Sequence, residues 1–232
     1  MRASFFDIDG TLVKGLMIYE FAKHLADKTL IKKSFFKEMN SYVMLYLKNK
    51  ITYREIAIIV PKLYAKGLKG VNVNIVKKEA KKFVDKYIKK FIQPYTQDLV
   101  RLMKSHGLTI GISGSPIEVV SCVGELFNFD LTYGTELEVL NGKYTGKIKQ
   151  NLIIKETKED VLKKIIKENK IGLTKSFGFG DTEQDLSFLS KVGHPVALNP
   201  NSTLLKIFKK NKWPFFTSKD DVVKSIKKDL EK

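Results

Sequence analysis

The stretch "SFFDIDGTLVKG", residues 4–15, places two acids, Asp7 and Asp9, between an apolar run and a glycine. The apolar run is typical of a buried strand, and Gly10 indicates that the chain turns directly after Asp9. If the strand continued, its period of two would aim both acids to the same side. Two carboxylates so close can share one divalent cation, or act as a nucleophile and an acid. The alternative is a loop that begins with solvated acids.

Strand-like and helix-like segments alternate along most of the chain. The strand-like runs lie at residues 3–8, 108–114, 131–134, 176–180 and 194–198, and helix-like runs lie near residues 96–106, 116–127, 158–169, 183–191 and 202–211. This alternation predicts an α/β fold, in which helices cover both faces of a mainly parallel sheet.

Two regions depart from this alternation. Residues 16–93 contain helical patterns and no convincing strand, which predicts a helical subdomain inserted after the first strand. The remaining core would then consist of residues 1–15 and 94–232. Within it, Asn141 and Gly142 separate two strand-like runs in residues 135–148, which predicts a β-hairpin.

The composition is that of a folded, basic protein. The 232 residues are 43% hydrophobic, which suits one domain with a large insertion or two small domains. The formal net charge is +17, and all but three of the 42 basic residues are lysines. In residues 75–92 the lysines recur at solvent-facing helical spacing, so a solvated surface is expected. Attraction to anionic partners such as nucleic acid is the alternative.

Further features limit the class of protein. Cys122 is the single cysteine, which excludes a disulfide framework and a cysteine-based zinc site, and its apolar surroundings predict a core thiol. No signal peptide and no apolar run long enough to span a bilayer is visible, so a cytoplasmic protein is expected. The oligomeric state does not follow from the sequence.

Ligands of open α/β sheets bind at the carboxyl ends of the strands. A second motif with polar side chains follows a predicted strand and would lie at such an end. In "GISGSPIEVV", residues 111–120, Ser115, Pro116 and Glu118 match a helix start in which Ser115 is the N-cap. Ser113 would then lie between a strand end and a helix N-terminus, where backbone N–H groups favour a bound phosphate. A serine-rich turn without a ligand is the alternative interpretation.

A third candidate is Lys158 in "KETKEDVLKKII". Thr157 and Asp160 match a helix cap, which would place Lys158 in a first helical turn, where the helix dipole disfavours a cation. A charge kept at such a position suggests a function. Lys155 is a nearby rival for the same role.

A fourth candidate lies in "FGFGDTEQDLSFL". Asp181 follows a glycine-rich strand and is a candidate third acid at the same edge of the sheet. Thr182 and Asp185 match a capping pattern, so Asp185 is interpreted as a helix cap at least as well as a functional acid.

Together and in this order, the four motifs resemble the haloacid dehalogenase superfamily of phosphohydrolases, within it the phosphoserine-phosphatase-like branch. The resemblance extends from "FFDIDGT" through "ISGSP", "GKYTGKI" and "GFGDTEQD" to "VGHPVALNPN". The last stretch is a marker of the branch and implies no catalytic role for His194. The resemblance implies a Rossmann-like α/β core with an inserted α-helical cap.

The resemblance also implies a Mg²⁺-dependent phosphomonoesterase acting on a small organic phosphate. Asp7 would attack phosphorus and form an aspartyl-phosphate. Asp9 would protonate the leaving alkoxide and then take a proton from the hydrolytic water. Mg²⁺ would be held by the Asp7 carboxylate, the Asp9 backbone carbonyl and Asp181.

The remaining motif residues would bind the phosphoryl group. Ser113, Gly114 and Lys158 would hold its oxygens, and Gly10 would let the backbone turn beside it. Asp185 would orient the magnesium ligands or Lys158.

The resemblance leaves the substrate open. Relatives of this branch that act on phosphoserine carry an acid shortly after the first motif and an arginine in the cap, whereas Leu16 stands about where that acid is expected. Glu20 lies one helical turn later, and Arg54 is the cap arginine. The positive charge supports a second hypothesis, a polyanionic substrate such as a nucleic-acid end or a lipid headgroup. A third is a non-catalytic basic binding module on the same fold.

Overall fold

The structure is a computed structural model that describes residues 1–217 and 221–231. The described strands form one sheet in the order β4-β3-β2-β1-β5-β6-β7. Their bounds are β1 Ala3–Phe6, β2 Leu108–Pro116, β3 Leu131–Leu140, β4 Lys143–Gln150, β5 Phe177–Gly180, β6 His194–Leu198 and β7 Phe215–Phe216. β4 is antiparallel to β3, and all other neighbouring pairs of described strands are parallel. The predicted mainly parallel α/β sheet is therefore confirmed.

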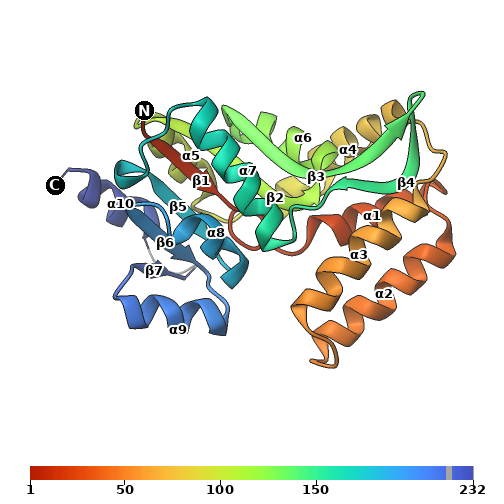
Figure 1. The fold of residues 1–232 in the computed structure, drawn as a ribbon, viewed down its shortest axis with the longest axis horizontal. Coiled ribbons are helices and arrows are strands. Elements are labelled where there is room, and N and C mark those ends of the chain that lie inside the picture. The colour runs from red at the N-terminus through yellow and green to blue at the C-terminus, as the bar shows by residue number, and fades with distance from the viewer. Residues whose placement is uncertain (218–220, 232) are drawn as a thin grey trace.

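Helices cover both faces of this sheet, as Figure 1 shows for α7 in front and for α5 and α6 behind. Ala3 and Phe5 of β1 lie in one apolar cluster with α7 (Lys155–Glu168), α8 (Leu186–Leu189) and α9 (Ser202–Asn211). Phe6 lies in the other cluster with α5 (Thr96–Lys104), α6 (Ile117–Phe127) and α10 (Val222–Leu230). Because successive side chains of a strand point to opposite faces, a strand covered on both sides is buried along its whole length, as β1 is, with Ser4 as its one polar residue.

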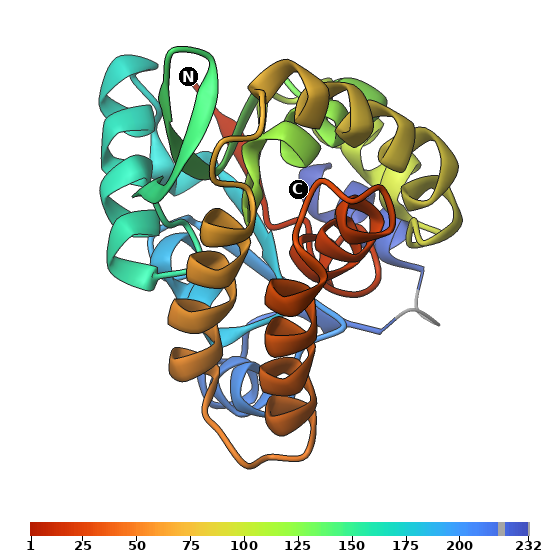
Figure 2. The ribbon, with the colours of Figure 1, turned by 90° about the vertical axis from the view of Figure 1, so that its right-hand side faces the viewer.

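Between β1 and α5, the described residues form helices, as predicted. Their only β-type pairing is in isolated bridges. The helices are α1 Met17–Asp27, α2 Lys33–Leu47, α3 Tyr53–Gly67, α4 Val73–Lys86 and the short 3₁₀ helix η1 Ile88–Lys90. Figures 1 and 2 show α2 and α3 side by side, projecting beyond the sheet.

The two segments that join these helices to the core lie next to each other. Lys14 N donates to Phe91 O at 2.8 Å, and Gln93 N donates to Leu12 O at 2.9 Å. One connected apolar cluster also continues from the helices into the core and includes both Phe21 of α1 and Val120 of α6.

The predicted β-hairpin is confirmed. Asn141 and Gly142 have φ angles of 49° and 72°, and positive φ at both turn residues is what a two-residue type I′ hairpin requires. The hairpin contacts the inserted helices, since Gly70 N donates to Tyr144 O at 2.8 Å. It therefore braces the segment between α3 and α4.

Two predicted helix starts are wrong. β2 continues through Pro116, and α6 begins at Ile117 without a side-chain cap, so Ser115 is not its N-cap. The Ser115 hydroxyl instead donates to Asp9. α7 begins at Lys155, and its N-cap is Ile154, three residues before the expected cap at Thr157. Thr157 is inside the helix, where the backbone N–H groups that a cap would bind already have helical partners.

Two further points concern the classes of protein considered above. Cys122 is half-buried on α6 and packs against the main apolar cluster, in agreement with a core thiol. Among the described residues, no helix has the length and apolar character required to cross a bilayer.

Candidate active site

The parallel sheet brings three of the four motifs to one edge. β2, β1 and β5 are neighbours, and Asp7 follows β1, Ser113 lies near the end of β2, and Asp181 follows β5. The carboxyl ends of parallel strands lie at the same side of a sheet, so these residues converge although up to about 170 positions separate them in sequence. Asp7 N donates to Phe179 O at 2.9 Å, which fixes the first acid against β5.

Lys158 of α7 joins two of the acids in a buried ion-pair network. Its Nζ donates to Asp7 Oδ1 at 3.0 Å and to Asp185 Oδ1 at 2.6 Å. Burial lowers the pKa of Lys158, but the two carboxylates, Asp185 foremost, outweigh it and raise that pKa overall. Burial, then repulsion from Asp185, raises the pKa of Asp7 against the attraction of Lys158. Lys158 therefore remains a fixed cation between the two acids.

Asp185 makes contacts that fit both interpretations from the sequence. Its Oδ1 accepts from Lys158, while its Oδ2 accepts from the backbone N–H groups of Asp181 and Thr182 at 3.2 and 3.1 Å. The capping interaction is thus present in the same side chain that holds the lysine. The side chain of the rival Lys155 lies outside the described part of the structure.

Asp181 is held by the loop that follows β1. Thr11 Oγ1 donates to Asp181 Oδ1 at 2.9 Å and approaches Asp7 Oδ2 at 3.4 Å. Gly10 has φ +84°, and a Cβ at this position would lie 2.2 Å from Asp181 Oδ2. A glycine is needed here both for the backbone conformation and for the close approach of the acid. Burial and then repulsion from Asp185 raise the pKa of Asp181.

Asp9 has a separate environment. Its carboxylate accepts from Ser113 Oγ at 2.5 Å, Ser115 Oγ at 3.0 Å and Met17 N at 2.6 Å. Burial raises its pKa, and these hydrogen bonds act in the opposite direction. Ser113, expected to bind phosphate, thus donates to Asp9 here, and Gly114 beside it leaves no room for a side chain, since a Cβ would lie 2.4 Å from Ile153 Cγ1.

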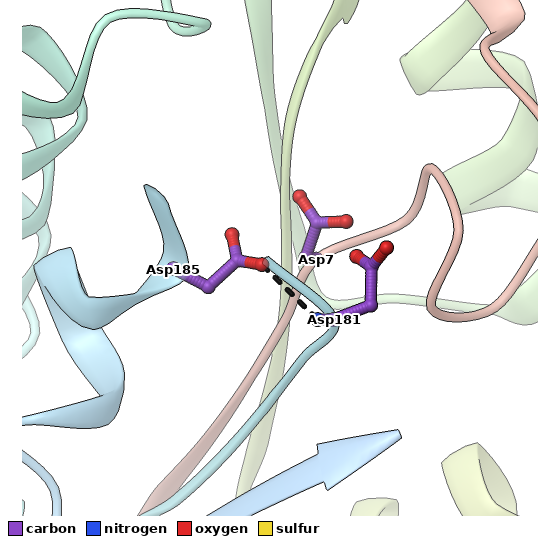
Figure 3. A group of neighbouring side chains, drawn as sticks. All are labelled: Asp7, Asp181 and Asp185. Atoms are coloured by element: carbon purple, nitrogen blue, oxygen red, sulfur yellow. Dashed lines mark hydrogen bonds between the residues drawn. The ribbon is translucent and has the colours of Figure 1, made fainter. Parts of the chain in front are cut away.

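The donor set of the site fits a hard divalent cation. Asp7, Asp181 and Asp185 each offer an oxygen within 4.8 Å of the others, and Figure 3 shows the three carboxyl groups around a common space. Mg²⁺ prefers such oxygen ligands. Of the expected metal ligands, Asp7 and Asp181 are in this group, whereas the Asp9 side chain faces the two serines. With Asp9 included, the described side chains of the cluster are four carboxyl groups and one lysine, Lys158, so they carry excess formal negative charge.

A pocket of about 380 Å³ opens over this cluster. Its floor consists of the acids and Lys158, and one wall is formed by residues of α2 and α3, namely Val43, Tyr46, Leu47, Tyr53, Ile56, Ala57 and Val60. Leu16 also lines it, but the two charged candidates for substrate recognition do not. Glu20 and Arg54 are exposed and lie outside the lining.

The sequence profile of the haloacid dehalogenase-like hydrolases matches residues 4–190. The chain belongs to this family. It is similar to a phosphoserine phosphatase of Mycobacterium tuberculosis, with 22% identity over 91% of this chain and 69% of the relative. It also resembles a histidinol-phosphatase of Neisseria meningitidis, with 30% identity over 62% of this chain and 68% of the relative.

Two solved structures show the same architecture. A protein of unknown function from Bordetella pertussis superimposes with a TM-score of 0.80 at 20% identity, covering 94% of this chain and 99% of the other. A substrate-bound phosphoserine phosphatase superimposes with a TM-score of 0.67 at 21% identity, covering 97% of each chain. At these identities the likeness concerns the fold.

Sequence reasoning missed several residues that hold the site of this haloacid dehalogenase-like hydrolase. Tyr95 OH donates to Thr11 O at 2.7 Å, and Thr96 Oγ1 donates to Leu12 O at 2.8 Å, so the start of α5 fixes the loop after β1. The local pattern at Ser115 indicates a helix cap and gives no sign of its contact with Asp9. Thr11, the last residue of the motif "FFDIDGT", was a usable signal, but nothing near Tyr95 in sequence indicates its partner.

Proposed function

We propose that this hydrolase is a Mg²⁺-dependent phosphomonoesterase that acts on a small organic phosphate through an aspartyl-phosphate on Asp7. Membership of the family and relatives named as phosphatases indicate a phosphoric monoester hydrolase. The observation that supports the finer proposal best is the difference between the two acids of the first motif. Asp7 lies in the ion-pair network with Lys158, whereas Asp9 lies among serine hydroxyls.

Asp7 is suited to act as the nucleophile. Its Oδ1 is held by Lys158 at 3.0 Å, while its Oδ2 has a long contact of 3.4 Å from Thr11. An Asp7 oxygen would form a bond to phosphorus as the ester P–O bond breaks, which divides one hard displacement into two easier ones. Water would then attack the aspartyl-phosphate, releasing inorganic phosphate and restoring the carboxylate.

Asp9 is suited to act as the general acid and then as the general base. Burial raises the pKa of both Asp7 and Asp9, but Asp7 is paired directly with the Lys158 cation, which favours its ionised form and leaves Asp9 as the carboxyl group suited to carry a proton to the leaving alkoxide. In the second step Asp9 would accept a proton from the attacking water. Two neighbouring carboxyl groups with different surroundings thus supply two different functions.

The carboxylates of Asp7 and Asp181, with the backbone carbonyl of Asp9, would hold Mg²⁺, and Asp185 lies beside them. The ion, when bound, would offset the charge of the acids and of the phosphate dianion. Without such a cation, four acids and one lysine would repel the substrate.

The phosphoryl oxygens would be held by Lys158, Ser113 and the backbone at Gly114, with Gly10 leaving room for the turn. Rotation of the Ser113 hydroxyl away from Asp9 would free it to donate to a phosphoryl oxygen.

Residues 16–93 would form a cap over a core of residues 1–15 and 94–232. Side chains of α2 and α3 in the pocket wall support this role. The chain enters these helices near Val13 and leaves them near Ile92, and an antiparallel bridge joins the two connecting segments. Because both connections lie together, the helices would move as a unit.

The test is phosphate release from a broad panel of phosphomonoesters with and without Mg²⁺. Asp7→Asn is expected to abolish release, while Asp98→Asn, which alters an exposed acid on α5, is expected to leave it unchanged. Turnover retained by Asp7→Asn would exclude the covalent mechanism.

The pocket gives the polyanion hypothesis no added support. Among the described residues that line it, Lys158 is the only lysine or arginine, and it is already paired with two acids. A steep fall of kcat/KM with salt on nucleic-acid ends, and little fall on small phosphates, would restore that hypothesis.

A further inference from the structure

The pocket has a polar floor and an apolar wall. The charged side chains that the described residues contribute to its lining, namely Asp7, Asp9, Asp181, Asp185 and Lys158, all belong to the floor. The wall from α2 and α3 includes four large aliphatic side chains, Val43, Leu47, Ile56 and Val60, and the smaller Ala57, with Tyr46 and Tyr53. The rings of Tyr46 and Tyr53 meet edge to face with centroids 6.2 Å apart.

Part of this apolar lining is open to solvent. Leu47 is 63% exposed and Leu16 is 42% exposed, although both line the pocket. Leaving large apolar side chains in water gives up free energy that burial would supply, and concave apolar surface of this kind marks a ligand site. The exposed leucines are positioned to be covered by an apolar group of a ligand.

Among the described residues of the lining, no charged side chain lies above the floor to pair with a charged group on the alcohol part of a substrate. The remaining polar side chains of the lining are neutral, including Thr182, Gln184 and Asn201 on the core side. Glu20 and Arg54, the residues expected to pair with an ammonium and a carboxylate, lie outside the lining. An ionised group moved against the aliphatic wall would lose its hydration without gaining a counter-ion.

We propose that this pocket selects phosphate monoesters whose alcohol part is uncharged and apolar, with the alkyl or aryl group lying against the wall of α2 and α3. This inference rests on the proposed phosphatase function, because it assumes that the phosphate occupies the floor. In this proposal, specificity comes from the apolar area that the wall offers for contact. Recognition of a zwitterionic substrate would instead require two charged side chains.

The first experiment uses ethyl, butyl, hexyl and octyl phosphate below micelle-forming concentrations. Their alcohols are almost equally poor leaving groups, so differences in kcat/KM report contact with the wall. Each added methylene is expected to raise kcat/KM by about two- to fourfold until the wall is covered. Phosphoserine is expected to be no better than ethyl phosphate. A flat series, or a preference for phosphoserine, would overturn the inference while leaving the phosphatase function intact.

The second experiment removes apolar area from the wall without disturbing the fold. Leu47→Ser is expected to lower kcat/KM for octyl phosphate about fivefold and to lower it less for ethyl phosphate, whose shorter alkyl group covers less of the wall. Leu140→Ser is the matched control, because Leu140 is 66% exposed on the β-hairpin and does not line this pocket. Equal effects of the two substitutions, or no effect of either, would count against the proposed wall.

A binding assay separates failure of the inference from failure of the catalytic proposal. If no phosphomonoester of the broad panel is hydrolysed, the phosphatase proposal fails, and calorimetric titration with ethylphosphonate and octylphosphonate still tests the wall. Octylphosphonate is expected to bind at least tenfold more tightly than ethylphosphonate, and less tightly to Leu47→Ser than to Leu140→Ser. Equal affinity of the two phosphonates would refute the apolar subsite.

Discussion

Gly10 controls the distance between the first motif and Asp181, so Gly10→Ala gives a direct test of the site. Gly10 has φ +84°, and a Cβ there would lie 2.2 Å from Asp181 Oδ2. To reach ordinary contact the carboxyl group would have to retreat by roughly 1 Å. That movement would also break the 2.9 Å hydrogen bond that Asp181 accepts from Thr11.

Two separate effects are expected. A side chain at positive φ costs about 1–2 kcal/mol, which for a chain of this length lowers Tm by about 2–8 °C. The displaced acid affects catalysis as well, since a misplacement of about 1 Å in an active site can lower the rate about 100-fold. We therefore expect Gly10→Ala to reduce kcat/KM about 100-fold and to raise the Mg²⁺ concentration needed for half-maximal activity.

Gly70→Ala is the matched control. Gly70 has nearly the same backbone strain, φ +83°, but a Cβ there would meet nothing within 4 Å. Both variants are expected to lose similar thermal stability, measured by calorimetry or circular dichroism, and Gly10→Ala alone is expected to lose activity. If the two variants retain phosphatase activity within threefold of each other, the assigned role of the Gly10 to Asp181 contact is wrong.

Three further predictions concern the ion pairs and the metal. Lys158→Met is expected to destabilise the fold by about 3 kcal/mol, because it leaves carboxylates buried without their cation. In a double-mutant cycle measured by urea unfolding, Asp185→Asn should cost less in the Lys158→Met background than alone, and strict additivity would show that the pair is not coupled. Chelation with EDTA is expected to abolish phosphate release and added Mg²⁺ to restore it; activity that survives exhaustive chelation would contradict the metal assignment. Hydrogen bonds from Lys82 and His24 lower the pKa of Glu79, so Glu79 stabilises the fold above its ordinary pKa and loses that effect as the pH falls through its lowered value. The Tm difference between the native protein and Glu79→Gln should accordingly be constant above about pH 5.5 and narrow as the pH falls below about 4.5, and a difference independent of pH down to about 3 would refute the linkage.

Local sequence was sufficient where neighbouring residues decide the conformation. Asn141 and Gly142 predicted a hairpin because both can adopt positive φ, and the alternation of apolar segments predicted the mainly parallel sheet. Prediction from local sequence failed where a residue that fits a local signal has a different partner in the folded protein. Ser115 fits a helix cap, yet its hydroxyl donates to Asp9, and β7 and α10 were not predicted because β7 has two residues and α10 buries only Val222 and Ile226.

The sequence by itself determined the fold class and which acids follow the strands, since strand periodicity and strand ends are local properties. The tertiary structure decided the partners of those acids. Lys158 meets Asp7 across 151 positions, and Ser113 meets Asp9 across 104. The apolar wall of the pocket also depends on how α2 and α3 pack over the sheet edge. Such contacts arise when separate elements bury their apolar faces against one another, so no short stretch of the chain contains them.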